Sequence, residues 1–180
     1  MKRRHQRSNE VNSMEYKRIL LGTDGGELMG PVYDHSAYMA QLADATVHTV
    51  YILDAWFTKY PSTRGMESMY YTLLSKGKEI VANAKKELTA RGVRGKRVIT
   101  EMLEGSPAER LVEYAESHAI NLIIMGAHGR KGLDRLIIGS VTDKIIREAK
   151  VPWLSYGARN DAHKWYCGSV RASFLLSSRA

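Results

Sequence analysis

The sequence contains one cysteine and four prolines among its 180 residues. A single cysteine, Cys167, cannot form a disulfide within the chain, so a disulfide-stabilised scaffold is excluded. No apolar run approaches the roughly 20 residues that a membrane-spanning helix requires. The basic N-terminal stretch is followed by polar residues rather than by the apolar segment of a signal peptide. We therefore expect a soluble, cytoplasmic protein.

Several familiar site motifs are also missing. The sequence has no GxGxxG after its first apolar segment and no GxxxxGK[ST] anywhere, and it has no CxxC, HExxH or EF-hand spacing. Neither a dinucleotide fingerprint nor a P-loop nor a common metal motif is predicted.

The charge is unevenly distributed. Lys and Arg number 27 against 19 Asp and Glu, a net charge of +8, which by itself favours an acidic partner such as nucleic acid or an anionic membrane surface. Residues 1–18 hold six basic and two acidic side chains (+4), and residues 157–180 hold four and one (+3). Residues 19–156 carry the remaining 17 basic and 16 acidic side chains, only +1. The basic character belongs to the ends of the chain, and nucleic acid is not the partner that we expect.

Short apolar segments alternate with longer amphipathic ones, as strands alternate with helices in βαβ units. Strands are expected at residues 17–23, 46–53, 96–103, 121–125 and 151–156, and helices at 27–45, at 66–91, from Ser106 onward, and up to Ala149. This pattern predicts an α/β fold, a single doubly wound domain with a five-stranded parallel sheet and helices on both faces. We expect that domain to occupy residues 17–156, between a flexible basic arm (1–16) and a flexible basic tail (157–180).

A glycine pattern follows the fourth predicted strand. Ligands of doubly wound sheets bind outside the carboxyl ends of strands, where the strand order reverses. Gly126-x-x-Gly129 stands at such an end, and Gly139-Ser140 follows at the start of the last helix. Glycine lets backbone N–H groups approach a ligand closely, and a helix start favours an anion. These residues predict a phosphate cradle; the alternative is that the glycines only form turns.

Residues 125–152 (MGAHGRKGLDRLIIGSVTDKIIREAKVP) resemble the G-x2-G-x9-G-[ST] signature of the universal stress protein family. Residues 19–26 (ILLGTDGG), 50–54 (VYILD) and 104–115 (EGSPAERLVEYA) are also similar to that family, so the resemblance covers roughly residues 17–156. It implies a parallel sheet of order 3-2-1-4-5, an adenine nucleotide at the strand ends, and membership of the ATP-binding subgroup.

The resemblance also implies a role for each matching residue. The expected ligand is ATP (or AMP or ADP), with Mg²⁺ bound to the phosphates. Ribose and phosphates would contact Met125, Gly126, His128 and Gly129, and phosphate would also contact Gly139, Ser140, Val141 and Thr142. Adenine would contact the backbone of Ile52, and the nucleoside or the metal would contact Thr23 and Asp24. Arg130 would either screen the triphosphate or keep a surface loop soluble, and Asp24 could instead form an Asx turn.

The sequence departs from the family pattern in two places. Gly22 and Gly26 replace the proline and serine that are common in the first strand and its turn. The last strand reads Pro152-Trp153-Leu154-Ser155-Tyr156 where P-V-L-V-V is usual. The resemblance implies a homodimer through this last strand, from Val151 to Tyr156. It does not define the geometry of that dimer, because the strand departs from the family pattern.

Three functions follow as hypotheses. The first is an ATP-binding, nucleotide-dependent regulator of a stress response. The second is a slow ATPase at the same site, for which His128 is the only candidate to position water. The third is a binder of nucleic acid or of a membrane surface through the basic ends.

Overall fold

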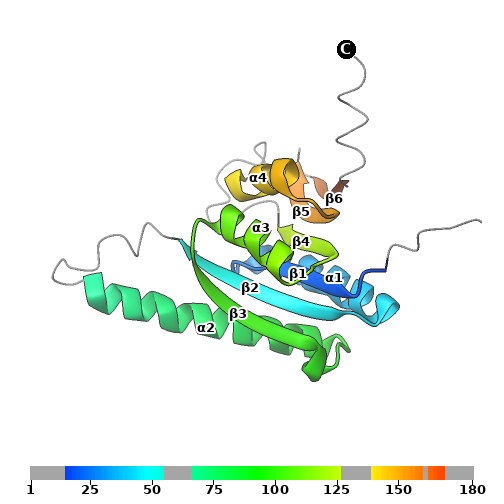
Figure 1. The fold of residues 1–180 in the computed structure, drawn as a ribbon. Helices are drawn as coiled ribbons and strands as arrows, with labels where there is room; N and C mark the ends of the chain where they lie inside the picture. Colours follow the sequence, from blue (N-terminus) through cyan, green and yellow to red (C-terminus); the bar gives the residue numbers. More distant parts are fainter. Residues whose placement is uncertain (1–14, 55–65, 127–138, 160–161, 169–180) are drawn as a thin grey trace, which may run out of the picture.

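The computed structural model describes residues 15–54, 66–126, 139–159 and 162–168. Its centre is one sheet with the strand order β3-β2-β1-β4-β5-β6, in which β1 to β5 are parallel and β6 runs antiparallel to β5 (Figure 1). The strands are β1 (Arg18–Gly22), β2 (Thr46–Asp54), β3 (Val98–Gly105), β4 (Leu122–Gly126), β5 (Trp153–Arg159) and β6 (Ala162–Gly168). The α/β class and the parallel order 3-2-1-4-5 of the first five strands agree with the prediction.

Helices cover both faces of the sheet. The helices are η1 (Glu27–Met29), α1 (Gly30–Ala43), α2 (Met66–Ala90), η3 (Gly95–Arg97), α3 (Pro107–Ser117) and α4 (Ser140–Glu148). Residues of α1 and α2 share one core cluster with β1 and β2, whereas residues of α3 and α4 pack on the opposite face. The fold is therefore a three-layer sandwich of the doubly wound kind.

The central strands are apolar on both faces because both faces are covered. Ile19, Leu20 and Leu21 of β1 and Ile123 and Ile124 of β4 are completely buried. These two strands pair directly with each other, and β1 pairs with β2 on its other side. The continuous apolar runs in the sequence are explained by this double burial.

The helix predicted at residues 27–45 is observed as the 3₁₀ turn η1 followed by α1, and both ends of α1 have a local explanation. A 3₁₀ turn precedes α1, and Pro31 lies in the first turn of α1, where a missing N–H costs nothing. The helix ends at Ala43, after which Asp44 adopts a left-handed conformation (φ 47°) and donates its N–H to the carbonyls of Ala40 and Gln41.

The prediction of five strands is wrong by one strand. Strand β6 lies within residues 157–180, where a flexible tail was expected, and it pairs with β5 along its whole length. The physical reason is that β5 would otherwise be an edge strand with unpaired backbone groups, and Trp165 and Tyr166 are good strand residues. The edge predicted to join two subunits runs from Val151 to Tyr156, and β6 of the same chain pairs with its residues 153–156.

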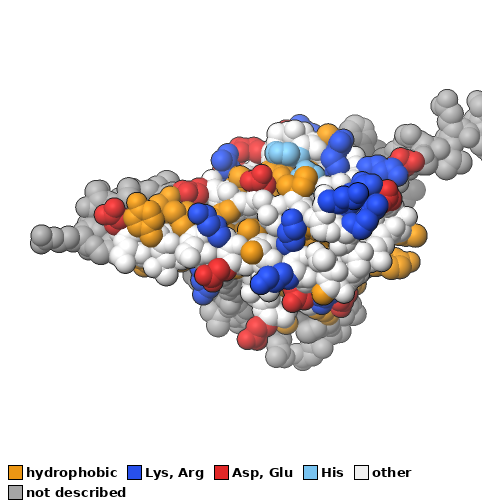
Figure 2. All heavy atoms as spheres, turned by 90° about the horizontal axis from the view of Figure 1, so that it is seen from below, with side chains coloured by type: hydrophobic (Ala, Val, Ile, Leu, Met, Phe, Trp, Pro, Cys, Tyr) orange, Lys and Arg blue, Asp and Glu red, His pale blue; other side chains and the backbone are white. Residues whose placement is uncertain are grey.

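Charged side chains of both signs are interspersed on the side of the molecule that carries α2 (Figure 2). Three of the lysines of α2, Lys78, Lys85 and Lys86, are exposed, as expected for a solvated helix face. In the described parts of the chain, no helix is both long and apolar enough to cross a membrane.

Candidate functional site

A cavity of about 190 Å³ lies at the carboxyl ends of β1, β2 and β4. The strand order reverses between β1 and β4, so the cavity is at the topological switch point where this architecture binds ligands. Helices α3 and α4 begin at the same cavity. It is lined by Gly22, Thr23, Asp24, Met29, Val50, Tyr51, Ile52, Pro107, Leu111, Met125, Gly126, Val141 and Thr142.

The turn after β1 is held in place by hydrogen bonds through Thr23. Its N–H donates to the carbonyl of Val50 (3.0 Å), and its hydroxyl lies 3.1 Å from the hydroxyl of Tyr33 in α1. The N–H of Gly25 donates to Thr23 Oγ1 at 3.2 Å. Burial raises the pKa of Tyr33, which keeps this phenol protonated and able to donate. The turn therefore presents a fixed wall to the cavity.

Asp24 serves this turn as well as the cavity. Its Oδ1 accepts a hydrogen bond from the N–H of Gly26 at 2.9 Å, which confirms the Asx turn considered from the sequence. Asp24 also lines the cavity and is the only carboxylate among the described lining residues. Its role towards a metal remains a prediction. In the described ranges, no three His, Cys, Asp or Glu side chains gather into a metal site.

The start of α4 offers backbone donors to the cavity. Gly139 is the N-cap residue and makes no side-chain cap, so the first amide groups of the helix are not satisfied by a capping side chain. Thr142, in the first turn, is buried and donates to the carbonyl of Gly126 at the end of β4 (3.3 Å). This bond fixes the helix start against the strand end.

Helix α3 approaches the cavity in the same orientation. Its N-cap Ser106 makes no side-chain cap, and Pro107 and Leu111 line the cavity from its first turns. Two helix amino ends, each with a partial positive charge, thus face one cavity. An anionic group is favoured there without any lysine or arginine on the described lining.

The remaining wall is apolar. Val50 and Ile52 project from β2, Leu111 from α3 and Met125 from β4, and Met29 completes the wall. Such a surface suits a flat organic ring, whereas the polar groups at the helix starts suit an anion.

The structure brings together seven of the twelve predicted site residues at the cavity. These are Thr23, Asp24, Ile52, Met125, Gly126, Val141 and Thr142. Gly139 and Ser140 directly precede Val141 and Thr142 in the chain, as the N-cap and the first residue of α4. His128, Gly129 and Arg130 lie outside the described residues.

Six lining residues were not assigned a role from the sequence: Gly22, Met29, Val50, Tyr51, Pro107 and Leu111. A signal existed for two of them. Val50 shares a strand face with Ile52 because side chains alternate along a strand, and Pro107 stands at the first position of a helix that begins after a strand end. Met29 and Leu111 reach the cavity only through tertiary packing.

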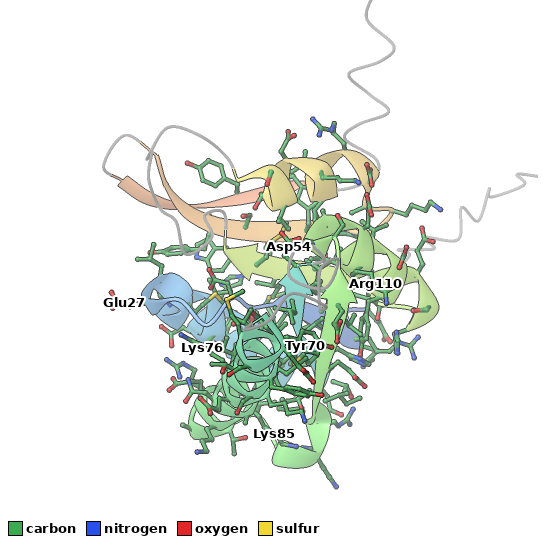
Figure 3. The ribbon with its side chains drawn as sticks, turned by 90° about the vertical axis from the view of Figure 1, so that its left-hand side faces the viewer. Glu27, Asp54, Tyr70, Lys76, Lys85 and Arg110 are labelled. Carbon is green, nitrogen blue, oxygen red and sulfur yellow. The ribbon has the colours of Figure 1, made fainter. Side chains whose placement is uncertain are left out.

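Figure 3 looks onto this edge of the sheet. Asp54, the last residue of β2, lies near the centre of the view, with Arg110 of α3 on one side and Glu27 on the other. Tyr70 of α2 donates its hydroxyl to Glu104 near the end of β3 (2.8 Å), which connects α2 to the carboxyl end of that strand.

These features define a doubly wound α/β domain with a ligand cavity at its switch point. The sequence profile of the universal stress protein family matches residues 15–155. The chain belongs to the universal stress protein family.

Individual relatives agree with this assignment. The universal stress protein MJ0531 of Methanocaldococcus jannaschii is 36% identical over 140 residues, which cover 77% of this chain and 81% of that protein. The solved structure of protein MJ0577 superimposes with a TM-score of 0.71 at 28% identity, covering 82% of this chain and 99% of that one. MJ0577 is also known as a universal stress protein of M. jannaschii.

Two solved structures carry nucleotides. A universal stress protein in complex with cAMP matches with a TM-score of 0.57 at 20% identity, covering 78% of this chain and 96% of that one. A universal stress protein from Archaeoglobus fulgidus in complex with dAMP matches with a TM-score of 0.55 at 18% identity, covering 78% and 98%. At 20% and 18% sequence identity, these two matches show only that the fold is shared.

Proposed function

We propose that the cavity binds an adenine nucleotide, ATP or its products ADP and AMP, and that the protein is a nucleotide-dependent regulator of a stress response. The observation that carries the proposal is the meeting of two helix amino ends, neither capped by a side chain, at one cavity at the switch point. Such helix ends bind phosphate through backbone N–H groups and the helix dipole. The adenine-nucleotide complexes of two relatives support the same ligand class.

We expect different parts of the nucleotide to contact different parts of the cavity. The base and ribose would lie against the apolar wall of Val50, Ile52 and Leu111, and the phosphates would lie at Gly126 and the start of α4. Asp24 would contact Mg²⁺ carried by the phosphates, since hard cations prefer carboxylate oxygens.

Binding rather than turnover is the function that the described lining favours. Asp24 is the only carboxylate there, and the same residues include no histidine, lysine or arginine that could position water or stabilise a leaving phosphate. A slow ATPase remains the second candidate and depends on His128. Turnover that is lost in His128→Ala while ATP binding is retained would establish it.

Regulation requires the nucleotide to bind two states of the protein with different affinities. The start of α4 is the element that we expect to respond, because its amide groups would be the ligands. Hydrogen exchange of residues 140–148 with and without ATP measures that response directly.

Calorimetric titration with ATP, AMP and GTP tests the proposal. We expect stoichiometric ATP binding that is lost when Gly139→Val is combined with Ser140→Ala, because the new side chain crowds the helix start and the hydroxyl is removed. The matched control is Gly95→Val with Ser75→Ala, since a Cβ at Gly95 lies 4.0 Å from its nearest neighbour, Thr89 Oγ1, and Ser75 is exposed on α2. Unchanged ATP binding in the first pair would contradict the proposal.

A further inference from the structure

Strand β6 covers the outer edge of β5. The two strands pair antiparallel over seven positions, from Trp153 opposite Gly168 to Arg159 opposite Ala162 (Figure 1). The match to the family ends at residue 155, within β5. Strand β6 therefore lies outside the part of the chain that the family profile covers.

The pairing of β6 is reinforced by specific packing. The ring of Trp165 lies 4.3 Å from that of His35 in α1 and 5.1 Å from that of Tyr156 in β5, centroid to centroid. At the end of β6, a Cβ on Gly168 would come within 2.6 Å of the indole ring of Trp153, so this position requires glycine. Strand β6 is fitted to the body of the protein by contacts on α1 and β5.

The fit is incomplete at one pair of residues. Ser155 and Tyr166 are directly opposite each other in the β5–β6 ladder. Ser155 Oγ and the hydroxyl of Tyr166 are both buried without a hydrogen-bond partner. A buried hydroxyl that has lost water and gained no partner weakens the structure that buries it. The pairing of β6 is therefore less stable than its length indicates, and β6 can detach more readily than an internal strand.

We propose that β6 is an intramolecular guard, which competes with a second copy of this chain for the outer edge of β5. An uncovered strand edge presents a row of N–H and C=O groups that pairs with another strand. While β6 is attached, its effective concentration at that edge is on the order of millimolar, which exceeds ordinary protein concentrations. The full chain is then a monomer, and release of β6 yields a two-fold dimer with β5 paired against β5.

A second copy suits this edge better than an unrelated strand does. In an antiparallel β5–β5 pair centred on Ser155, the two Ser155 hydroxyls stand opposite each other and can bond across the pair, which satisfies the group that β6 leaves unpaired. Leu154 and Tyr156 pack on the α1 side of the sheet. In this register Leu154 of one copy stands opposite Tyr156 of the other on that face. The contact is self-complementary, as a two-fold interface requires.

Light scattering of the full chain tests the proposal. We expect the unmodified protein to have a mass of 20.3 kDa. Tyr166→Pro removes a ladder N–H from β6 and should double the mass, and the milder Trp165→Ala, which removes the packing on His35, should shift it part of the way. Cys167→Ser is the matched control, since Cys167 is exposed on the same strand and should leave the monomer unchanged.

A disulfide lock gives an independent test that does not depend on a destabilised variant. Leu154 is directly opposite Cys167 in the ladder, so Leu154→Cys places two cysteines across the β5–β6 pair. Oxidised at low protein concentration, this variant should stay monomeric at every concentration. Reduced and carrying Trp165→Ala in addition, it should dimerise.

Two outcomes would overturn the proposal. One is a dimer of the unmodified protein in which the amides of residues 162–168 are protected from hydrogen exchange. The other is a Tyr166→Pro or Trp165→Ala protein in which these amides exchange freely while the mass stays that of a monomer.

Discussion

The Nδ1 atom of His48 lies 3.0 Å from the hydroxyl of Tyr114, which joins β2 to α3 at the end of the sheet opposite the cavity. The ring of Tyr114 also stacks on that of His118, with centroids 3.8 Å apart. Burial, chiefly, raises the pKa of Tyr114 to about 12, so its hydroxyl keeps its proton and can donate to an unprotonated Nδ1. Helix α3 is thus fixed at one end by this pair while its other end lines the cavity.

This pair predicts a loss of stability in mild acid. Burial lowers the pKa of His48, and the neighbouring His118 and Arg18 lower it further, so the unfolded chain binds a proton at His48 more readily than the folded one does. The contribution of His48 to the free energy of unfolding is then complete above the ordinary histidine pKa, and it falls as the pH drops through that value towards the lower pKa of the folded state. The loss is about 1.4 kcal/mol for each pH unit that separates the two pKa values. Urea unfolding from about pH 7.5 to about pH 5 should show this fall. His48→Gln should flatten the curve; an equally steep curve in that variant would assign the effect to other groups.

Gly25→Ala should destabilise the turn after β1. Gly25 has a φ of +70°, and a Cβ there would lie 2.7 Å from Ile80 Cγ1 in α2. Backbone strain and overlap together predict a loss of about 1–3 kcal/mol in unfolding free energy. Chemical denaturation measures it, and adding Ile80→Ala should recover only the part due to overlap. Gly95→Ala, in open space, should be close to neutral.

Gly77→Ala should move a wall of the cavity. Gly77 lets α2 approach the sheet, because a Cβ there would lie 2.6 Å from Met102 Sδ and 2.8 Å from Tyr51 Cε1. Alanine favours the helix by up to about 1 kcal/mol, but displacing the ring of Tyr51 is expected to cost about 1–3 kcal/mol, so the net effect should be destabilising. Because Tyr51 lines the cavity, ATP affinity should also fall. Higher stability with unchanged affinity would show that the ring moves without cost.

Thr142→Val should weaken nucleotide binding more than it weakens the fold. The substitution preserves shape but removes the bond from Thr142 Oγ1 to the carbonyl of Gly126, which holds the start of α4 to β4. We expect about a tenfold loss of ATP affinity, equivalent to about 1.4 kcal/mol, by calorimetry. Thr89→Val is the control, since that hydroxyl also donates to a backbone carbonyl, that of Lys85, but lies at the far end of α2.

The sequence was sufficient to predict the parallel core because its signals are local. Central strands such as β1 and β4 must be continuously apolar. The placement of Gly126 and Thr142 at one site follows from the spacing of a strand end and a helix start. The position of the cavity then follows from strand order.

What could not be predicted depends on contacts between distant segments. Strand β6 has no apolar alternation of its own, and it is a strand because β5 offers an edge and His35 offers a surface to Trp165. Leu111 similarly becomes a cavity residue only when α3 packs on β2 and β3. The bond between His48 and Tyr114 joins residues 66 positions apart, and nothing in either local sequence indicates it.

The antiparallel direction of β6 also determines where the chain can be modified. Gly168 lies opposite Trp153, the first residue of β5, and β1 likewise begins at Arg18 on that side of the sheet. Both ends of the described core therefore lie at the amino ends of the parallel strands β1 to β5, away from the cavity mouth. A reporter joined to the described core at Glu15 or directly after Gly168 would be attached on the side opposite the cavity, leaving titrations with nucleotide undisturbed.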